Sequence, residues 1–175
     1  MSRGQASGLM HTPSLSIRVA RQDDLDVLWT FLAIAAHEPD IAKAKATPVV
    51  AAHLAGWRRS CDFGYIAESN GFALGATWAR QFAPSEEPAF YVDDRTPEIS
   101  LAVHETMRGK GLGQSLLGAL IGEAKRRGVG LCLNVRDSNP AARLYERAGF
   151  RRVQGTEVRN RVEGWSFGMI LRPDS

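Results

Sequence analysis

Hydrophobic and polar residues alternate with two different periods along this chain, and the period distinguishes the expected helices from the expected strands. Residues 16–20 predict a short strand, and residues 22–36 place apolar side chains at helical spacing behind an acidic start. Residues 37–48 are polar, contain two prolines and separate that helix from a second helix expected over residues 49–59. The second helix ends in two arginines, which suit the negative end of a helix dipole.

A β-hairpin is expected next. Residues 62–69 and 72–82 predict two strands, and Asn70 and Gly71 between them are the pair that a two-residue turn favours. Residues 83–95 contain two prolines, acidic side chains and aromatic side chains. We interpret this last stretch as a loop near an opening.

The following segment predicts a strand, a glycine-rich turn and a long helix. The strand covers residues 98–103, and the amphipathic helix runs to Arg127. Gly128 closes that helix, and three basic residues before it suit the helix C-terminus.

The last part of the chain predicts a third pair of elements and two closing strands. A mostly apolar strand covers residues 131–136, and Asn139–Pro140 opens a helix as cap and first residue. The closing strands are expected over residues 150–154 and 165–171. Because strands and helices alternate around one mixed sheet, the predicted fold class is α/β, which some schemes call α+β.

Length and composition match one ordinary globular domain. The chain has 175 residues, of which 44% are hydrophobic and 23% charged, and this size supports a core without disulfide or metal staples. Residues 1–14 are rich in Ser, Gly and Thr and lack periodicity. We expect a disordered leader there, native or added, and a single domain over residues 15–172.

Cysteine usage and charge exclude several classes of protein. Cys61 and Cys132 are too few for a secreted disulfide framework and form no Cys/His cluster, so neither a metal site nor a redox motif is expected. No apolar run approaches the roughly 20 residues of a membrane span, so we expect a cytoplasmic protein without membrane contact. The net charge of +3, from 22 basic and 19 acidic residues, is weak evidence for nucleic acid, and none is expected as a partner.

The glycine-rich turn before the long helix carries the most informative chemistry. Free backbone N–H groups and the positive end of the helix dipole converge there, which makes an anion site. Gly109, Gly111 and Gly113 let the backbone approach a phosphate, and Arg108 and Lys110 add positive charge. The spacing fits neither a Walker A loop nor the dinucleotide fingerprint GxGxxG, but it fits RxxGxG.

This turn resembles the acyl-CoA pyrophosphate loop of the GNAT N-acetyltransferase superfamily, Q/R-x-x-G-x-G/A, between the fourth strand and the following helix. Downstream, the run from Asn139 to Phe150 resembles the family segment NxxAxxLYxxxGF. The resemblance covers about residues 16–171. It implies a mixed, mostly antiparallel central sheet flanked by helices, and an enzyme that moves an acetyl group from acetyl-CoA directly to a primary amine.

The resemblance also implies which residues bind acetyl-CoA. They are the end of the fourth strand, the glycine-rich turn and two residues of the second motif: Leu101, Ala102, Val103, Arg108, Gly109, Lys110, Gly111, Leu112, Gly113, Gln114, Asn139 and Tyr145. Asn139 is equally explained as a helix cap, and the two roles are compatible.

Two catalytic side chains follow from the resemblance. The matching family tyrosine protonates the leaving thiolate, which gives this role to Tyr145, although its helical position alone predicts a core residue. A protonated amine must lose a proton before it attacks, and Glu98 is the expected base, ahead of His104. A backbone N–H near Val103 is expected to stabilise the oxyanion. The strand that carries Glu98 is usually bulged in the family, and a slip of one residue would leave an inert carboxylate on the other face.

The acceptor is open between a small molecule and a peptide amine. Glu38 or Glu86 suits a cationic amine, whereas Arg80 suits an amine that bears a carboxylate, and a homodimer is compatible with the resemblance. The rival hypothesis is a non-catalytic acyl-CoA-binding or regulatory module. A third class, a toxin-like enzyme acting on charged tRNA, requires a basic patch, and no basic stripe with interleaved aromatic residues occurs in the sequence.

Overall fold

The computed structural model of the chain describes residues 14–161 and 163–173. The leader expected over residues 1–14 therefore lies outside the described residues, except for Ser14. In chain order the elements are β1 (Leu15–Val19), η1 (Gln22–Asp24), α1 (Leu25–Ala35), α2 (Ile41–Ala46), α3 (Pro48–Ala51), β2 (Phe63–Ser69), β3 (Phe72–Arg80), η2 (Pro84–Glu86), β4 (Glu98–Val103), η3 (Glu105–Met107), α4 (Leu112–Arg127), β5 (Leu131–Arg136), α5 (Ala142–Arg147), β6 (Arg151–Arg152), β7 (Val158–Arg159) and β8 (Trp165–Leu171).

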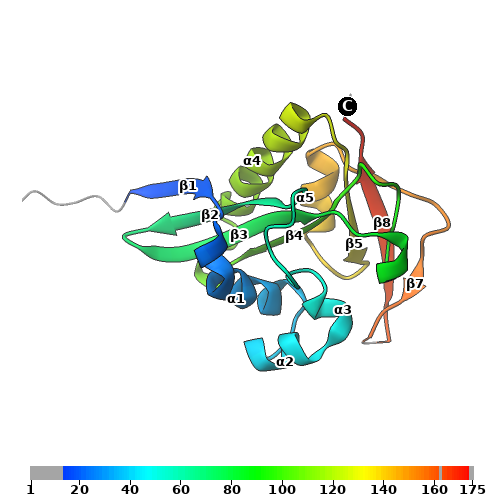
Figure 1. Cartoon of the computed structure of the whole chain (residues 1–175), viewed down its shortest axis with the longest axis horizontal. Coiled ribbons are helices and arrows are strands. Elements are labelled where there is room, and N and C mark those ends of the chain that lie inside the picture. Colours follow the sequence, from blue (N-terminus) through cyan, green and yellow to red (C-terminus); the bar gives the residue numbers. More distant parts are fainter. Residues whose placement is uncertain (1–13, 162, 174–175) are drawn as a thin grey trace, which may run out of the picture.

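One sheet joins all the described strands. Its order is β1-β2-β3-β4-β5-β8-β6, with β7 also paired to β8 (Figure 1). Every pairing is antiparallel except that of β4 with β5, which is parallel. The predicted α/β class with a mixed, mostly antiparallel sheet flanked by helices is therefore confirmed.

The helices cover the two faces of the sheet and create two apolar cores. On one face α1, α2 and α3 pack against β3 and β4, with Leu28, Trp57 and Trp78 in the core. On the other face α4 packs against β2, β3 and β4, and α5 shares the same core with β5 and β8, with Leu120 and Phe150 buried in it. Figure 1 shows α4 and α1 on opposite sides of the sheet. The sheet thus separates two environments, and β4 contributes alternate residues to each.

Strands β4 and β5 separate soon after they meet. Their register contains a single pair, Glu98 with Cys132, and the Cys132 N–H donates to the Pro97 carbonyl at 2.9 Å. On its other edge β5 pairs with β8 along its whole length, from Leu131 to Arg136. The sheet therefore opens between the C-terminal halves of β4 and β5, and both strands line the gap.

The expected hairpin turn and the expected end of the long helix are confirmed. Asn70 and Gly71 have φ values of 51° and 78°, as a two-residue hairpin turn requires. Gly128 closes α4 in the left-handed conformation, and Gly149, with φ of 98°, follows α5. Among the described helices, none combines the length and the apolar character that a membrane crossing needs.

The helix expected over residues 49–59 is wrong beyond its first turn. Helix α3 covers only Pro48–Ala51, and the chain then turns, with positive φ at Gly56 and Arg58. The carbonyls of Ala52 and Ala55, which a longer helix would use internally, accept hydrogen bonds from Arg80 of β3.

Short elements near the polar stretches were also mispredicted. The stretch 37–48 contains helix α2, which begins after Asp40, where the carboxylate accepts from the Lys43 N–H at 2.7 Å. The closing strand expected over 150–154 is reduced to β6, and β7 was not expected.

Candidate active site

The glycine-rich turn is built as an anion site. Gly109 and Gly111 have φ values of 71° and 80°, a region that side chains other than glycine rarely adopt. The Ser115 N–H donates to the Gly111 carbonyl at 3.1 Å and begins the helical ladder of α4, so the N–H groups of residues 112–114 have no acceptor within the helix. Arg108 is exposed beside them. These donors and the helix dipole favour a phosphate group here.

A cleft of about 710 Å³ runs from this turn to α5. Every residue predicted to bind the cofactor lines this cleft, with the exception of Lys110. Met107, Pro140 and Leu144 add apolar surface to its walls. The residues that the two motifs place far apart in sequence therefore surround one elongated cavity.

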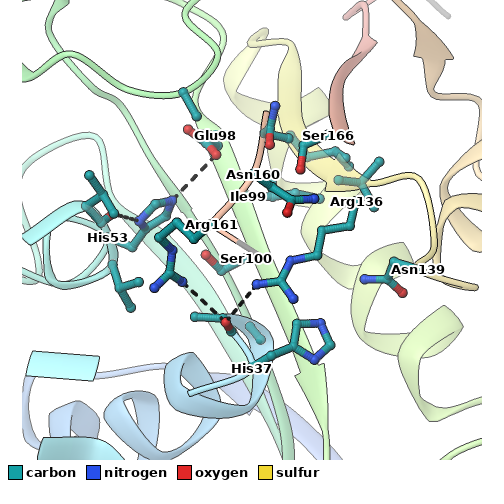
Figure 2. A pocket seen from close by; sticks show the side chains of 18 of the residues that line it. His37, His53, Glu98, Ile99, Ser100, Arg136, Asn139, Asn160, Arg161 and Ser166 are labelled. Carbon is teal, nitrogen blue, oxygen red and sulfur yellow. Dashed lines mark hydrogen bonds and ion pairs between the residues drawn. The ribbon is translucent and has the colours of Figure 1, made fainter. Parts of the chain in front are cut away.

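A second cavity, of about 410 Å³, lies against β4, β5 and the segment around β7 (Figure 2). The two cavities share five lining residues: Ala35, His37, Leu101, Asn139 and Tyr145. Because Leu101 belongs to β4 and Tyr145 to α5, the cavities meet beside the opening between β4 and β5. A donor in the larger cleft and an acceptor in the smaller cavity would meet at this point.

Tyr145 lies at the junction of the two cavities. Its residue surface is 7% exposed, its ring packs edge-on against Phe150 at 5.8 Å, and its hydroxyl has no hydrogen-bond partner among the described residues. Burial raises the pKa of Tyr145 to about 12. The phenol therefore keeps its proton at neutral pH and is available as a donor.

Asn139 lies at the same junction and also caps the turn before α5. Its side-chain oxygen accepts from the Ala141 N–H at 2.9 Å. The spacing from Asn139 to Tyr145 is one residue shorter than in the motif NxxAxxLYxxxGF. The expected helix start at Asn139–Pro140 is wrong by two residues, since α5 begins at Ala142 with Ala141 as its N-cap.

Glu98 faces the smaller cavity. Strand β4 pairs with β3 without a register shift, so the expected bulge is absent from this pairing. In this register Glu98 lies opposite Arg80. Alternation along β4 puts Glu98 on the same face as Ser100 and Ala102, toward α1. The carboxylate is 7% exposed, and its Oε2 atom has no partner among the described residues. An unpartnered buried oxygen that lines a cavity is placed to accept a proton.

His53 faces Glu98 across this cavity, and the sequence pattern did not single it out. Its Nε2 atom lies 3.5 Å from Glu98 Oε1, and its Nδ1 atom lies 3.1 Å from the Val49 carbonyl, to which Nδ1–H donates (Figure 2). Desolvation is the largest effect on the pKa of His53 and lowers it, but Glu98 and the carbonyls of Val49 and Val50 outweigh it, so the pKa is raised above 6.5. Glu98 therefore favours the protonated form of His53.

Strand β3 holds the turn that carries His53. Trp78 Nε1 donates to the His53 carbonyl at 3.1 Å, and Arg80 Nη1 donates to the carbonyls of Ala52 and Ala55 at 2.8 and 2.5 Å. Arg80 in turn pairs with Asp62 at 2.8 Å, and both side chains are fully buried. A buried ion pair therefore fixes the backbone on both sides of His53.

Comparison with known proteins identifies the family. The model of the acetyltransferase (GNAT) family matches residues 28–150. The chain belongs to the acetyltransferase (GNAT) family. Ribosomal protein bS18-alanine N-acetyltransferase of Haemophilus influenzae is 44% identical over 61 residues, which are 34% of this chain and 42% of that relative. This match spans less than half the length of the curated relative.

Solved structures share the GNAT fold. A putative acetyltransferase from Salmonella typhimurium, solved with its cofactor acetyl-CoA, has a TM-score of 0.68 and 22% identity, over 93% of this chain and 95% of that chain. The ribosomal-protein-S18-alanine N-acetyltransferase of Escherichia coli has a TM-score of 0.64 and 25% identity, over 90% of this chain and 93% of that chain. The predicted membership of the GNAT superfamily is therefore confirmed.

The GNAT strand β4 presents free backbone donors to the gap. The His104 N–H donates to the Leu74 carbonyl on the β3 side, whereas the Pro97 carbonyl accepts on the β5 side. Because successive residues of a strand point their backbone groups to alternate sides, the N–H groups of Leu101 and Val103 point toward the gap. Leu101 lines both cavities, whereas Val103 lines only the larger cleft.

Other predicted site residues of this GNAT chain lie elsewhere. His104 is exposed and caps η3, with its Nδ1 atom 2.8 Å from Thr106 Oγ1. Arg80 is buried against Asp62 and lines neither cavity. Glu38 pairs with Arg161, and Glu86 pairs with Arg59. None of these carboxylates lines the smaller cavity among the residues that the structure describes.

Proposed function

We propose that residues 15–172 form a single N-acetyltransferase domain that transfers an acetyl group from acetyl-CoA directly to an amine of a small molecule or peptide. The observation that carries this proposal is the meeting of two cavities at Leu101 and Tyr145, beside the opening between β4 and β5. The family match and the relatives that are named N-acetyltransferases support it.

The larger cleft fits an acyl-CoA. The free N–H groups at the start of α4 and the Arg108 side chain suit the pyrophosphate, and the apolar walls around Met107 and Leu144 suit the pantetheine arm. When bound, acetyl-CoA supplies a thioester, whose carbonyl is open to attack by an amine. This role matches that of the Salmonella neighbour, which was solved with acetyl-CoA.

Glu98 acts as the general base in this proposal. An amine with a pKa of about 10.4 arrives protonated at neutral pH and must lose a proton before it attacks. Glu98 precedes Leu101 by three residues, about 10 Å along the strand, so its carboxylate takes the proton through a chain of water molecules. His53 holds the buried carboxylate in place through its contact with Oε1, and acts as a positioning residue.

Leu101 and Tyr145 serve the acyl group. The Leu101 N–H points into the gap and donates to the developing oxyanion, a role that the sequence had given to Val103. Tyr145 donates its phenolic proton to the departing thiolate, whose conjugate acid has a pKa of about 8.5. As the thiol leaves, the phenol recovers a proton from solvent.

Direct transfer is favoured over a cysteine intermediate. Burial raises the pKa of the Cys132 thiol well above its usual range, and its Sγ donates to the Thr96 carbonyl. Cys61 is exposed and lines neither cavity. Two free cysteines suit a reducing compartment, and we infer that the enzyme works in the cytoplasm.

Thiol release from acetyl-CoA, measured with a panel of amines, tests this function. We expect acetyl-CoA to raise the Tm and at least one amine to release thiol, with kcat lowered about 100-fold or more in Tyr145→Phe and in Glu98→Gln. Tyr65→Phe is the matched control, because Tyr65 lines neither cavity. A raised Tm without thiol release from any amine would favour the non-catalytic acyl-CoA-binding module instead.

A further inference from the structure

The smaller cavity is lined by more cations than anions. Arg136 reaches it from the end of β5, and Arg161 reaches it from the turn after β7 (Figure 2). Arg159 of β7 also lines it. Among the described lining residues, Glu98 is the one carboxylate. The balance of charge therefore depends on which of these groups is already neutralised by a neighbour.

Two of the charged groups are paired within the protein. Glu98 faces His53, and Arg161 forms an ion pair with Glu38, whose side chain is 7% exposed. These two pairs contribute little net charge to the cavity. What remains is the charge of Arg136 and Arg159.

Arg136 and Arg159 have no carboxylate partner among the described residues. Arg136 Nη2 makes a long hydrogen bond of 3.4 Å to the Ala36 carbonyl. Arg159 Nη1 donates to the Glu163 carbonyl at 3.2 Å, and its guanidinium lies 5.2 Å from the centre of the Trp165 ring. Carbonyls and rings carry no formal charge, so these contacts leave both guanidinium charges uncompensated.

Arg136 is the better placed of the two. It is half-buried at the end of a strand that is paired along its whole length with β8, whereas Arg159 is exposed. Arg136 Nη2 lies 3.4 Å from the carbonyl of Ala36, and the neighbours of that residue, Ala35 and His37, line both cavities. The guanidinium therefore lies beside the junction of the two cavities.

The positive charge of Arg136 also affects the pKa of His37. Desolvation first, and then the charges of Arg136 and Arg108, lower the pKa of His37, which lines both cavities. A neutral His37 leaves the arginines as the fixed charges at the junction. A polycationic acceptor, such as a polyamine or a strongly basic peptide, would be repelled there.

We infer that the acceptor is a small molecule that carries a carboxylate close to its amine, as an α- or β-amino acid does. This inference rests on the proposed function. Arg136 holds the carboxylate through charge-assisted hydrogen bonds, while the amine lies at Leu101 and passes its proton toward Glu98. A cavity of about 410 Å³ is in the range of small-molecule sites. Sequence reasoning had offered Arg80 for this carboxylate, but Arg80 is occupied by Asp62.

The test compares three acceptors that share the same side chain: an amino acid, its amide and the amine that lacks the carboxyl group. The comparison is repeated for several side chains. We expect kcat/KM for the amino acid to exceed that for the other two by about 10- to 100-fold. Arg136→Gln is expected to remove this preference by lowering only the amino-acid rate, and Arg136→Lys to restore part of it. Arg151→Gln is the matched control, because Arg151 is exposed and lines neither cavity.

The outcomes separate this inference from the function beneath it. Equal or faster acetylation of the amides, the amines without carboxylate, a polyamine or a basic peptide would overturn the inference and leave the N-acetyltransferase standing. An unchanged preference in Arg136→Gln, with an unchanged Tm, would overturn the role of Arg136. Absence of both an acetyl-CoA-dependent rise in Tm and any thiol release would overturn the proposed function itself.

Discussion

Replacing Asp62 with alanine is expected to destabilise the protein strongly, because it leaves the Arg80 guanidinium buried without its counter-charge. Both side chains of this pair are 0% exposed, and the N–O distance is 2.8 Å. Removing one partner of a buried ion pair costs about 3–5 kcal/mol. For a chain of 175 residues each kcal/mol lowers the Tm by about 2–4 °C, so we expect a fall of about 6–20 °C.

Thermal unfolding followed by circular dichroism measures this effect, with an exposed ion pair as control. Arg152 and Glu157 are also 2.8 Å apart, but their side chains are 50% and 39% exposed, so Glu157→Ala is expected to change the Tm little. A fall in Tm in Asp62→Ala no larger than that in Glu157→Ala would show that the buried ion pair contributes no more to stability than an exposed one.

A double variant separates charge from shape. Asp62 Oδ1 and Arg80 Nε have no hydrogen-bond partner among the described residues, so desolvation of the pair is only partly compensated. Asp62→Leu combined with Arg80→Met removes both charges and is expected to recover part of the lost stability. Recovery is incomplete because the carbonyls of Ala52 and Ala55 then lack their donor.

Three further predictions concern the site. Tyr145→Phe should lower kcat about 100-fold or more while leaving the KM for acetyl-CoA unchanged in steady-state assays, and a loss confined to KM would contradict the donor role. Gly111→Asp should abolish the rise in Tm caused by acetyl-CoA, because Gly111 has φ of 80° and the new charge would face the pyrophosphate, whereas Gly118→Asp on the exposed side of α4 should retain it. In urea titrations His53→Gln should lower the free energy of unfolding, relative to wild type, more at pH 6 than at pH 9. Because the pKa of His53 is raised in the folded protein, its contribution to stability is fully present below about pH 6.5 and is lost as the pH rises through the pKa of the folded state. An equal loss at both pH values would show that Glu98 does not hold His53 charged.

Local chemistry explains which elements the sequence predicted well. The hairpin turn at Asn70 and Gly71, the end of α4 at Gly128 and the anion site around Gly111 each depend on residues that are adjacent in the chain. Their conformations follow from φ preferences and helix-end hydrogen bonding. Signals of this kind are visible without knowledge of the fold.

Long-range contacts explain what the sequence could not predict. The segment after Ala51 has apolar spacing suited to a helix, but Arg80 takes the carbonyls of Ala52 and Ala55 from 28 and 25 residues away. The resulting turn points His53 at Glu98, which is 45 residues further on. Tertiary hydrogen bonds from Arg80 thus override local propensity and place His53 beside Glu98.

The smaller cavity is a second feature that depends on long-range contacts and could not be predicted from the sequence. Its charges come from the ends of β5 and β7, from β4 and from the turn after α3, and only the opening between β4 and β5 brings these segments together. Arg80 and Arg136 are equally plausible carboxylate ligands by residue type, and their difference lies in burial: Arg80 is 0% exposed and paired, whereas Arg136 is half-buried and faces the cavity.

The proposed function is direct transfer of an acetyl group from acetyl-CoA to an amine acceptor. Its most direct test is simultaneous measurement of free thiol, of the acceptor by mass spectrometry and of the intact protein mass, with acetyl-CoA alone and then with an amino acid added. With acetyl-CoA alone we expect no thiol release and no change in protein mass. After the amino acid is added, we expect one N-acetylated acceptor for each thiol released. A burst of thiol with acetyl-CoA alone, accompanied by an acetylated cysteine, would contradict it.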